Sequence, residues 1–395
     1  MSKRTLDAFF KPSTTPTKRP KTDSEPTTSN TTTTPAPPNI PIEDSNPPNQ
    51  HPSYPFPIAQ LPDHISIGLK HATPATQPKK ITNQPHLNLL IFQPYIPRQT
   101  STALFTFLLN SLPFYRVTYK IKRGTTETQI TTPRYTTVFG VDSTSIFAQT
   151  DSSTSTSNLN LNLNLLDTQT NKPVSNSKYQ CTPRPIPACL DLLRQSVEAA
   201  NVDSEGRTPG YNFCLVNYYA SGDDSIAFHS DDERFLGPEP NIASLSLGGE
   251  RDFVMKHKPF VGGVSDRAGG GVGGSHDAAG TRVSSGTRVT GVSGTVSGGG
   301  LDGSARMPVE QIKIKLGSGD MVVMRGETQA NWLHSIPKRK GRGGEMIKGR
   351  INITFRRAVV PGGTENYYRY NVGSGGVYRW DEAARTMVLR NEGKE

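Results

Sequence analysis

The chain has 395 residues, 33% of them hydrophobic, and its 44 Lys and Arg against 34 Asp and Glu give a formal net charge of +10. This length supports one large or two ordinary domains, and the positive balance favours a polyanionic partner. Only three cysteines and no apolar run of membrane-spanning length disfavour a disulfide scaffold and a transmembrane helix, so we expect a soluble intracellular protein.

Residues 1–82 are rich in Thr, Pro, Ser and Asn and contain few aromatic residues. Such a composition cannot bury enough apolar surface to offset the entropy lost on ordering, so we predict a disordered tail over residues 1–82. Six basic residues against one acidic residue in Met1–Thr22, including Lys18-Arg19-Pro20-Lys21, indicate a nuclear localisation signal.

Two helices are predicted in the first half of the remaining chain. The apolar run Ala103–Leu112 follows Ser101-Thr102, which we expect to cap it, and Pro187 opens a helix from Ala188 to about Ala200. Alternation in Tyr115–Lys122 predicts a strand between them. Residues 150–176 carry a Ser/Thr-rich stretch and an Asn-Leu repeat and are predicted to form a surface insertion.

Beyond Tyr211 the pattern is that of strands, and Gly317-Ser318-Gly319-Asp320 predicts a hairpin turn between two of them. Residues 261–305, of which 15 are Gly, are predicted to be a flexible insertion within the same sheet system. We therefore predict an α+β, mainly β fold, a double-stranded β-helix (jelly roll) flanked by helices, over residues 83–360. The predicted strands are Asn212–Tyr219, Ile242–Leu247, Asp252–His257, Gln311–Leu316, Met321–Arg325 and Arg350–Arg357.

The segment His229-Ser230-Asp231 indicates a metal site. In an extended segment the side chains of His229 and Asp231 point to the same side, and a third ligand comes from another strand, for which His334 is the candidate. Two imidazoles and one carboxylate can occupy one face of a ferrous ion and leave the other positions open. Because a His-x-Asp pair is common by chance, the metal site needs support from a second motif downstream in the chain.

Such a motif is the strand Arg350–Arg356, which places four polar side chains, Arg350, Asn352, Thr354 and Arg356, on one face. A wholly polar inner face is costly to bury unless a ligand satisfies it, and arginines bind carboxylates through charge-assisted bonds. Together with the metal site, this predicts an iron- and 2-oxoglutarate-dependent oxygenase. The alternative is an edge strand with a solvated arginine face.

With these motifs the sequence resembles the AlkB family of nucleic-acid dealkylating dioxygenases, within it the DNA-repair members, from roughly residue 83 to residue 358. The spacing departs from the family pattern, because Asp231 and His334 are 334 − 231 = 103 residues apart and residues 261–305 lengthen that gap. The shared segments, in order, are Asn217-Tyr218-Tyr219, His229-Ser230-Asp231-Asp232-Glu233, Ile242–Gly248, Arg251–Val254, Trp332–Pro337 and Arg350–Arg356.

The resemblance implies Fe(II) held by His229, Asp231 and His334, with 2-oxoglutarate and O2 as cosubstrates. Asp232 matches the acidic residue that meets the exocyclic amine of a damaged base, and Phe147 is a candidate for stacking on that base or for ordinary core packing. The implied 2-oxoglutarate contacts are Asn217, Tyr219, Arg350, Asn352, Arg356 and Thr354, and Thr132-Pro133-Arg134-Tyr135 resembles the start of the substrate lid, which makes Arg134 and Tyr135 candidate substrate residues.

The implied activity is oxidative demethylation of 1-methyladenine and 3-methylcytosine in DNA, with release of formaldehyde, succinate and CO2. The alternatives are an RNA demethylase of the same family and a catalytically dead, clamp-tethered nucleic-acid-binding protein. Lys338 and Arg339, in a basic run after the third ligand, are expected to bind phosphates.

Near the N-terminus, Leu6, Phe9 and Phe10 lie in a peptide that resembles the segment by which repair proteins dock on the PCNA sliding clamp. We expect a nuclear monomer without a membrane partner. For the extension 361–395 the sequence leaves two interpretations, a closing hairpin or a DNA-contacting tail.

Overall fold

The computed structural model describes residues 47–148, 165–174, 179, 181–259, 310–341, 348–359 and 363–390. The helices in this part of the chain are α1 (Asp63–His71), α2 (Arg98–Ser111), α3 (Ala188–Ala199), α4 (Thr328–Asn331) and α5 (Gly363–Asn371). The strands are β1 (Lys79–Ile81), β2 (Leu89–Phe92), β3 (Thr118–Arg123), β4 (Thr126–Thr131), β5 (Tyr135–Gly140), β6 (Ser145–Phe147), β7 (Leu165–Asp167), β8 (Phe213–Tyr219), β9 (Ile226–His229), β10 (Ile242–Gly248), β11 (Arg251–His257), β12 (Ile312–Leu316), β13 (Met321–Met324), β14 (Trp332–Ile336), β15 (Arg350–Arg356), β16 (Tyr378–Asp381) and β17 (Thr386–Leu389).

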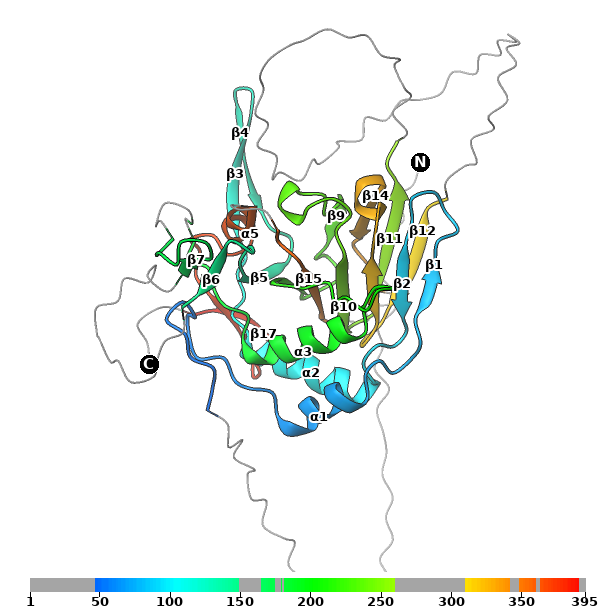
Figure 1. Ribbon diagram of the computed structural model, residues 1–395. Helices are drawn as coiled ribbons and strands as arrows, with labels where there is room; N and C mark the ends of the chain where they lie inside the picture. Colours follow the sequence, from blue (N-terminus) through cyan, green and yellow to red (C-terminus); the bar gives the residue numbers. More distant parts are fainter. Residues whose placement is uncertain are drawn as a thin grey trace, which may run out of the picture. The chain divides into compact units, whose positions relative to one another are not determined.

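Two antiparallel sheets form the framework. One has seven strands in the order β1-β2-β13-β10-β15-β8-β5, and the other has four in the order β12-β11-β14-β9 (Figure 1). In both sheets, strands from distant parts of the sequence are neighbours. In the seven-stranded sheet β15 lies between β8 and β10, and in the four-stranded sheet β14 lies between β9 and β11. The result is a mixed α/β architecture rich in strands, as the sequence predicted.

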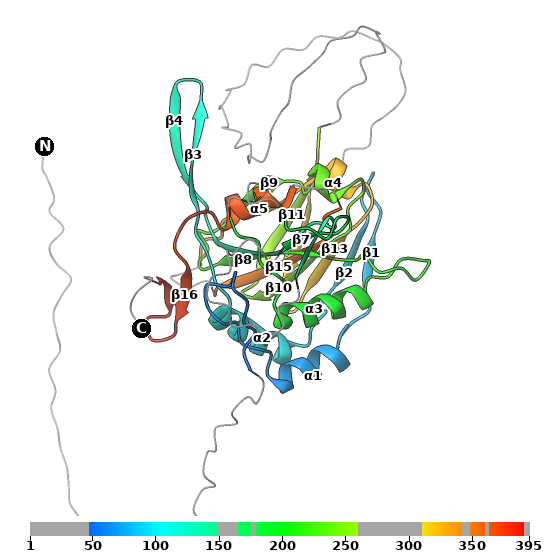
Figure 2. The ribbon, with the colours of Figure 1, turned by 60° about the vertical axis from the view of Figure 1, so that its left-hand side comes forward.

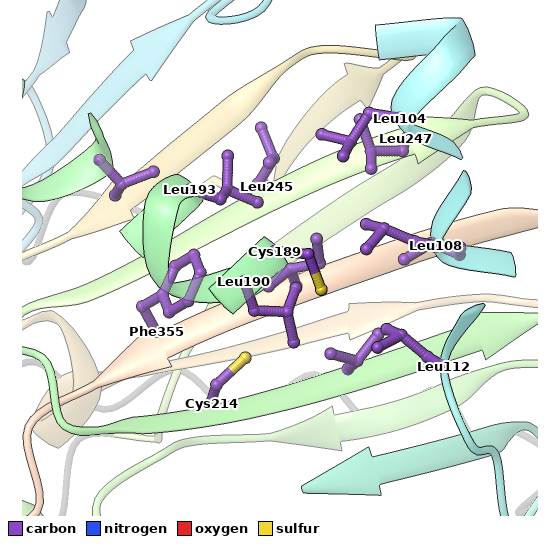
Figure 3. Close-up of a cluster of buried hydrophobic side chains, with 14 of the residues drawn as sticks. Leu104, Leu108, Leu112, Cys189, Leu190, Leu193, Cys214, Leu245, Leu247 and Phe355 are labelled. Atoms are coloured by element: carbon purple, nitrogen blue, oxygen red, sulfur yellow. The ribbon is translucent and has the colours of Figure 1, made fainter. Parts of the chain in front are cut away.

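The seven-stranded sheet separates two hydrophobic clusters. Helices α1, α2 and α3 cover one face, where leucines of α2 and α3 pack on alternate residues of β8, β10 and β15 (Figure 3). On the other face, Phe213, Leu215 and Tyr219 of β8 join apolar side chains of β11, β12 and β14 from the four-stranded sheet, whereas β15 places buried polar side chains there. The central strands β8, β10 and β15 are therefore buried on both faces, and the polar side chains of β10 and β15 face the four-stranded sheet.

Helix α2 begins at Arg98, earlier than predicted, and Ser101 lies inside its first turn rather than at its cap. The Ser101 hydroxyl donates to the Arg98 carbonyl oxygen at 3.0 Å. The apolar residues of the helix begin only at Ala103. The apolar pattern therefore could not indicate the polar first turn that precedes them. Helix α3, in contrast, agrees with its predicted start at Ala188 and ends at Ala199.

The predicted disordered tail over residues 1–82 is too long. Residues 47–82 contain α1 and β1, and the side chains of Tyr54, Ile58 and Leu61 are buried against the helical layer. A few apolar residues scattered in a Pro-rich stretch gain their burial from α2 and α3, which local composition does not reveal. Residues 1–46 lie outside the described residues.

The predicted hairpin turn at Gly317–Asp320 joins two different sheets. It connects β12 of the four-stranded sheet to β13 of the seven-stranded sheet, so the two strands are not paired with each other. The turn docks on β10, where the Gly319 amide donates to the Ser246 carbonyl oxygen at 2.8 Å. Of the two predicted insertions, 150–176 contains β7, which pairs with β6, whereas 261–305 lies outside the described residues.

The C-terminal extension folds back on the seven-stranded sheet, in agreement with the closing-hairpin interpretation. Its strands β16 and β17 form a hairpin, and Tyr378 makes a β-bridge with Phe114. Helix α5 lies beside the base of the projecting β3–β4 hairpin, where Tyr370 contacts Tyr119 at 5.3 Å between ring centroids (Figure 2). None of the helices in the described ranges combines the length and apolar character that crossing a bilayer requires.

Candidate metal and cosubstrate site

Three side chains from β9, the segment that follows it and β14 meet at one place in the structure. His229 ends β9, Asp231 follows two residues later, and His334 lies opposite His229 in β14. One candidate ligand atom from each residue lies within 4.8 Å of the other two. His229 Nε2 is 3.8 Å from Asp231 Oδ1, and the two imidazole centroids are 4.2 Å apart. The predicted convergence of these three residues is confirmed.

Hydrogen bonds to the surrounding protein orient two of the candidate ligands. His229 Nδ1 donates to the Ala227 carbonyl oxygen at 2.9 Å, which leaves Nε2 as the nitrogen with a free lone pair. The Asp231 backbone amide donates to Gln329 Oε1 at 2.9 Å. Gln329 belongs to the short helix α4 directly before β14, so the same segment positions Asp231 and His334.

The protonation states suit metal ligation. Burial, with the neighbouring His229, lowers the pKa of His334 to about 3, and burial also lowers the pKa of His229. Burial acts to raise the pKa of Asp231, but the Arg356 guanidinium and the two imidazoles hold that pKa well below its usual range. At neutral pH the site therefore offers two neutral imidazoles and one carboxylate, the deprotonated forms that a metal ion requires.

Arg356 anchors the carboxylate of the triad. Its Nη2 donates to Asp231 Oδ2 at 2.7 Å, and both side chains are less than 5% exposed. Thr354 holds the guanidinium from the other side, since its hydroxyl accepts from Arg356 Nη1 at 2.7 Å and donates to the Leu215 carbonyl oxygen at 3.0 Å. Thr354 thus supports Arg356 rather than presenting a free hydroxyl to a ligand.

Arg350, at the other end of β15, is a buried cation with unused donors. Its Nη2 donates to Ser246 Oγ at 2.8 Å, whereas its Nε and Nη1 have no hydrogen-bond partner within the described residues. The guanidinium lies 5.3 Å from the centroid of the Tyr219 ring, and Arg251 lies 5.6 Å from the same ring. Burial lowers the pKa of Arg350 to about 10. Buried donors of this kind fit a carboxylate of a small diacid.

Asn352 lies between Arg350 and Arg356 on β15, and Asn217 lies beside it on β8. They face each other in the register of β15 and β8, and both are buried. Asn352 Nδ2 donates to Ser244 Oγ at 2.9 Å and to the Leu245 carbonyl oxygen at 3.0 Å. Arg134, predicted to contact substrate, donates from Nε to Asn217 Oδ1 at 2.8 Å. Arg134 therefore contacts a residue that the sequence predicted to bind 2-oxoglutarate.

Tyr135 does not face the site, which corrects its assignment to the substrate group. It pairs with Tyr218 across β5 and β8, so its ring lies on the opposite face of the sheet from Asn217. There it packs edge-on against Tyr378 of the C-terminal hairpin at 5.2 Å between centroids. The alternation of a strand decides this, because the residue next to an inward-facing Arg134 must point outward.

The remaining predicted substrate residues have other partners. Asp232 Oδ2 accepts from Lys258 Nζ at 2.7 Å, and its side chain is half exposed. Phe147 packs edge-on against His51 at 5.8 Å between centroids and borders the cluster between the sheets, which fits the core-packing interpretation of this residue. Lys338 is exposed, while Arg339 Nη1 donates to the Glu250 carbonyl oxygen at 2.7 Å.

Several supporting residues escaped the sequence analysis. Ser244 and Ser246 hold Asn352 and Arg350, and their alternation with leucines in β10 was a detectable signal. No pattern in the sequence indicated a role for Gln329 or Tyr367. Burial, followed by the charge of Asp231, raises the pKa of Glu233 to about 7, and Tyr367 donates its hydroxyl to Glu233 Oε1 at 2.8 Å.

Comparison with known families agrees with this geometry. The model of the 2OG-Fe(II) oxygenase superfamily matches residues 88–356, which include all three candidate metal ligands and both arginines. The chain belongs to the 2OG-Fe(II) oxygenase superfamily. The ferrous ion and 2-oxoglutarate in the family's name are the groups that the sequence predicted. The triad and the unsatisfied donors of Arg350 fit both of them.

Relatives of this superfamily member carry AlkB-type names. A DNA oxidative demethylase ALKBH2 from Arabidopsis thaliana is 36% identical over 146 residues, 37% of either chain. The ALKBH2 of Mus musculus is 31% identical over 178 residues, 45% of this chain and 54% of the relative. The alpha-ketoglutarate-dependent dioxygenase alkB homolog 3 of Rattus norvegicus is 30% identical over 186 residues, 47% of this chain and 46% of the relative. The matches span about half the length of these relatives or less, and they confirm the AlkB-family resemblance.

Proposed function

We propose that this protein is an Fe(II)- and 2-oxoglutarate-dependent dioxygenase that removes N-methyl groups from DNA bases. The observation that carries the proposal is the pairing of the His229, Asp231 and His334 triad with Arg350, a buried arginine that has unused donors. A metal ion alone does not account for Arg350, whereas a metal-bound diacid does. Names of relatives at about 30% identity, DNA oxidative demethylase among them, support DNA as the substrate.

Each residue has a definite task in this proposal. His229, Asp231 and His334 would hold the iron, which would supply the oxidation of the methyl group. Arg350 would bind the distal carboxylate of 2-oxoglutarate, with the Tyr219 ring beside it. Arg356 fixes Asp231, so that the carboxylate oxygen facing the imidazoles keeps its position.

Substrate handling follows from the charge and position of the site. A methylated ring nitrogen lies inside a duplex, so the base must be flipped out of the stack, and damage lowers the cost of unstacking. The formal charge of +10 favours a polyanion, and Asp232 beside the triad offers an acceptor for the exocyclic amine of 1-methyladenine or 3-methylcytosine. Lys258 would have to release Asp232 for that contact.

The test is formaldehyde release from oligonucleotides that carry 1-methyladenine or 3-methylcytosine, as single- and double-stranded DNA and as RNA. We expect release from methylated DNA only when iron and 2-oxoglutarate are both present, with one succinate formed for each formaldehyde. His229→Ala, which removes a candidate ligand, should abolish it. Turnover of methylated RNA in preference to DNA would favour the RNA demethylase, and full activity of His229→Ala would contradict the metal assignment.

Four finer assignments belong to the same proposal. The two sheets would form a double-stranded β-helix, the jelly roll that the strand pattern predicted. The protein would act as a monomer. Leu6, Phe9 and Phe10 would dock on a PCNA-like sliding clamp, and the basic cluster at Lys18–Lys21 would direct the protein to the nucleus. These residues lie outside the described part of the chain, and a pull-down with the clamp, with Phe9→Ala as control, tests the docking.

A further inference from the structure

Helix α5 of the C-terminal extension packs beside residues that surround the metal site. It comes after β15, beyond a short connection, and lies near the 3-10 turn at Arg234–Leu236. Tyr367, on α5, contacts Phe213 of β8 and Phe235 of that turn edge-on, at 5.3 and 5.5 Å between ring centroids. The extension thus supplies one wall beside β15, although the family match ends at residue 356.

Two contacts connect Tyr367 to residues around the metal site. The Arg356 guanidinium lies over the Tyr367 ring, with 5.5 Å between Cζ and the ring centroid. The Tyr367 hydroxyl donates to Glu233 Oε1 at 2.8 Å. Arg356 in turn donates to Asp231 Oδ2 at 2.7 Å, so a continuous series of contacts runs from the extension to a candidate ligand.

We propose that Tyr367 is a positioning residue for the metal centre, because its ring fixes the guanidinium that holds Asp231. An aromatic face attracts a cation above it and restricts the orientations of its plane. Arg356 is held by Thr354 at Nη1 and by Asp231 at Nη2, while its Nε has no partner within the described ranges. The ring thus adds a contact on the face of the guanidinium to the two hydrogen bonds made in its plane.

The ring and the hydroxyl of Tyr367 make separable contributions. Tyr367→Phe keeps the ring under Arg356 and deletes the hydrogen bond to Glu233, whereas Tyr367→Met fills similar space without an aromatic face. If the ring positions Arg356, the Phe variant should bind metal like the wild type and the Met variant should not. A role limited to packing would leave the metal affinity of both variants unchanged.

The experiment measures Mn²⁺ binding to the full chain by calorimetry, without nucleic acid or 2-oxoglutarate. We expect Tyr367→Met to weaken binding roughly 10-fold, the lower end of the usual effect of residues that orient metal ligands. The visible spectrum of bound Co²⁺ should change in the same variant, because the geometry of the Asp231 carboxylate changes. Tyr370→Met is the matched control, since Tyr370 lies on the same helix and contacts Tyr119 instead.

A fluorination series keeps the test decisive if Tyr367→Met does not fold. Phenylalanine with increasing fluorine content at position 367 keeps the ring shape and weakens the negative face that attracts a cation. The Mn²⁺ dissociation constant should then rise step by step. An unchanged dissociation constant across that series would overturn the proposal.

The inference rests on the metal centre of the proposed function and not on its DNA substrate. If the wild-type protein fails to bind Mn²⁺ and His229→Ala makes no difference, the proposed function fails at the metal. If the wild type binds Mn²⁺ and the ring variants bind it equally well, only the positioning role of Tyr367 fails.

Discussion

Replacing Arg356 by Met should destabilise the metal-free protein more than any substitution in an exposed ion pair. Arg356 Nη2 and Asp231 Oδ2 are 2.7 Å apart, and the two side chains are 3% and 4% exposed. Removing one partner of a buried pair leaves an uncompensated charge and costs about 3–5 kcal/mol. Since domains are stable by about 5–15 kcal/mol, the loss would consume a large share of the stability.

Urea unfolding in the presence of a chelator measures this difference directly. Arg207→Met is the matched control, because Arg207 pairs with Asp203 at 2.8 Å while the two side chains are 68% and 41% exposed. Such a pair contributes about 0–1 kcal/mol. Adding Asp231→Asn to Arg356→Met should recover part of the loss, since the stranded charge is then removed. Equal losses for the Arg356 and Arg207 variants would refute the reasoning.

Three further predictions concern the cosubstrate, the nucleic acid and the thiols. Arg350→Met should raise the dissociation constant for 2-oxoglutarate at least about 30-fold, because losing a buried charged contact costs about 2 kcal/mol or more. Calorimetry in the presence of Mn²⁺ would measure this constant. Changing Lys338 and Lys340 together to Ala should weaken DNA binding for all sequences and reduce the salt slope by up to about 2, measured by fluorescence anisotropy. Burial raises the pKa of Cys189 to about 12 and that of Cys214 further, so iodoacetamide at neutral pH should modify neither thiol until the protein unfolds.

Controls make these outcomes specific. Without 2-oxoglutarate, Arg350→Met should change the unfolding free energy little, because two of the donors lost have no protein partner within the described residues. Lys79→Ala with Lys80→Ala removes two exposed charges from β1 at the sheet edge and should leave the salt slope near its wild-type value. In the native protein the half-buried Cys181 should be alkylated before the other two cysteines, as peptide mass spectrometry would show.

Local periodicity explains why the central site residues could be found in the sequence. In Arg350–Arg356 the alternation of a strand alone places Arg350 and Arg356 on one face, and the register with β8 and β10 confirms that face. His229 and Asp231 are two residues apart in an extended segment, so their side chains also point to the same side. The predicted ends of α3 and of the six predicted strands after Tyr211 were close because each rests on a pattern within a short segment, whereas β9 and β14 were not among the predicted strands.

The burial of residues 47–82 and the packing partner of Tyr135 show where local reasoning fails. The first segment is Pro-rich and polar on average, yet its few apolar side chains are buried because α2 and α3 offer them a surface. Tyr135 comes directly after an inward-facing arginine, and its ring belongs to a cluster completed by Tyr378, far away in the chain. The burial of residues 47–82 and the partner of Tyr135 depend on segments that are distant in the chain, whereas the outward direction of Tyr135 follows from strand alternation.

The sequence by itself indicated that His229 and Asp231 share a face, that Arg350 and Arg356 share another, and that the fold is rich in strands, because each is a property of residues a few positions apart. His334 was found through the resemblance of the short segment Trp332–Pro337 to a known family. Only the tertiary structure decided that Gln329 holds Asp231, that Lys258 engages Asp232 and that Tyr367 underlies Arg356. The physical reason is that such contacts join segments whose separation in the chain carries no periodic signal. They arise only when packing of the two sheets and α5 brings those segments together.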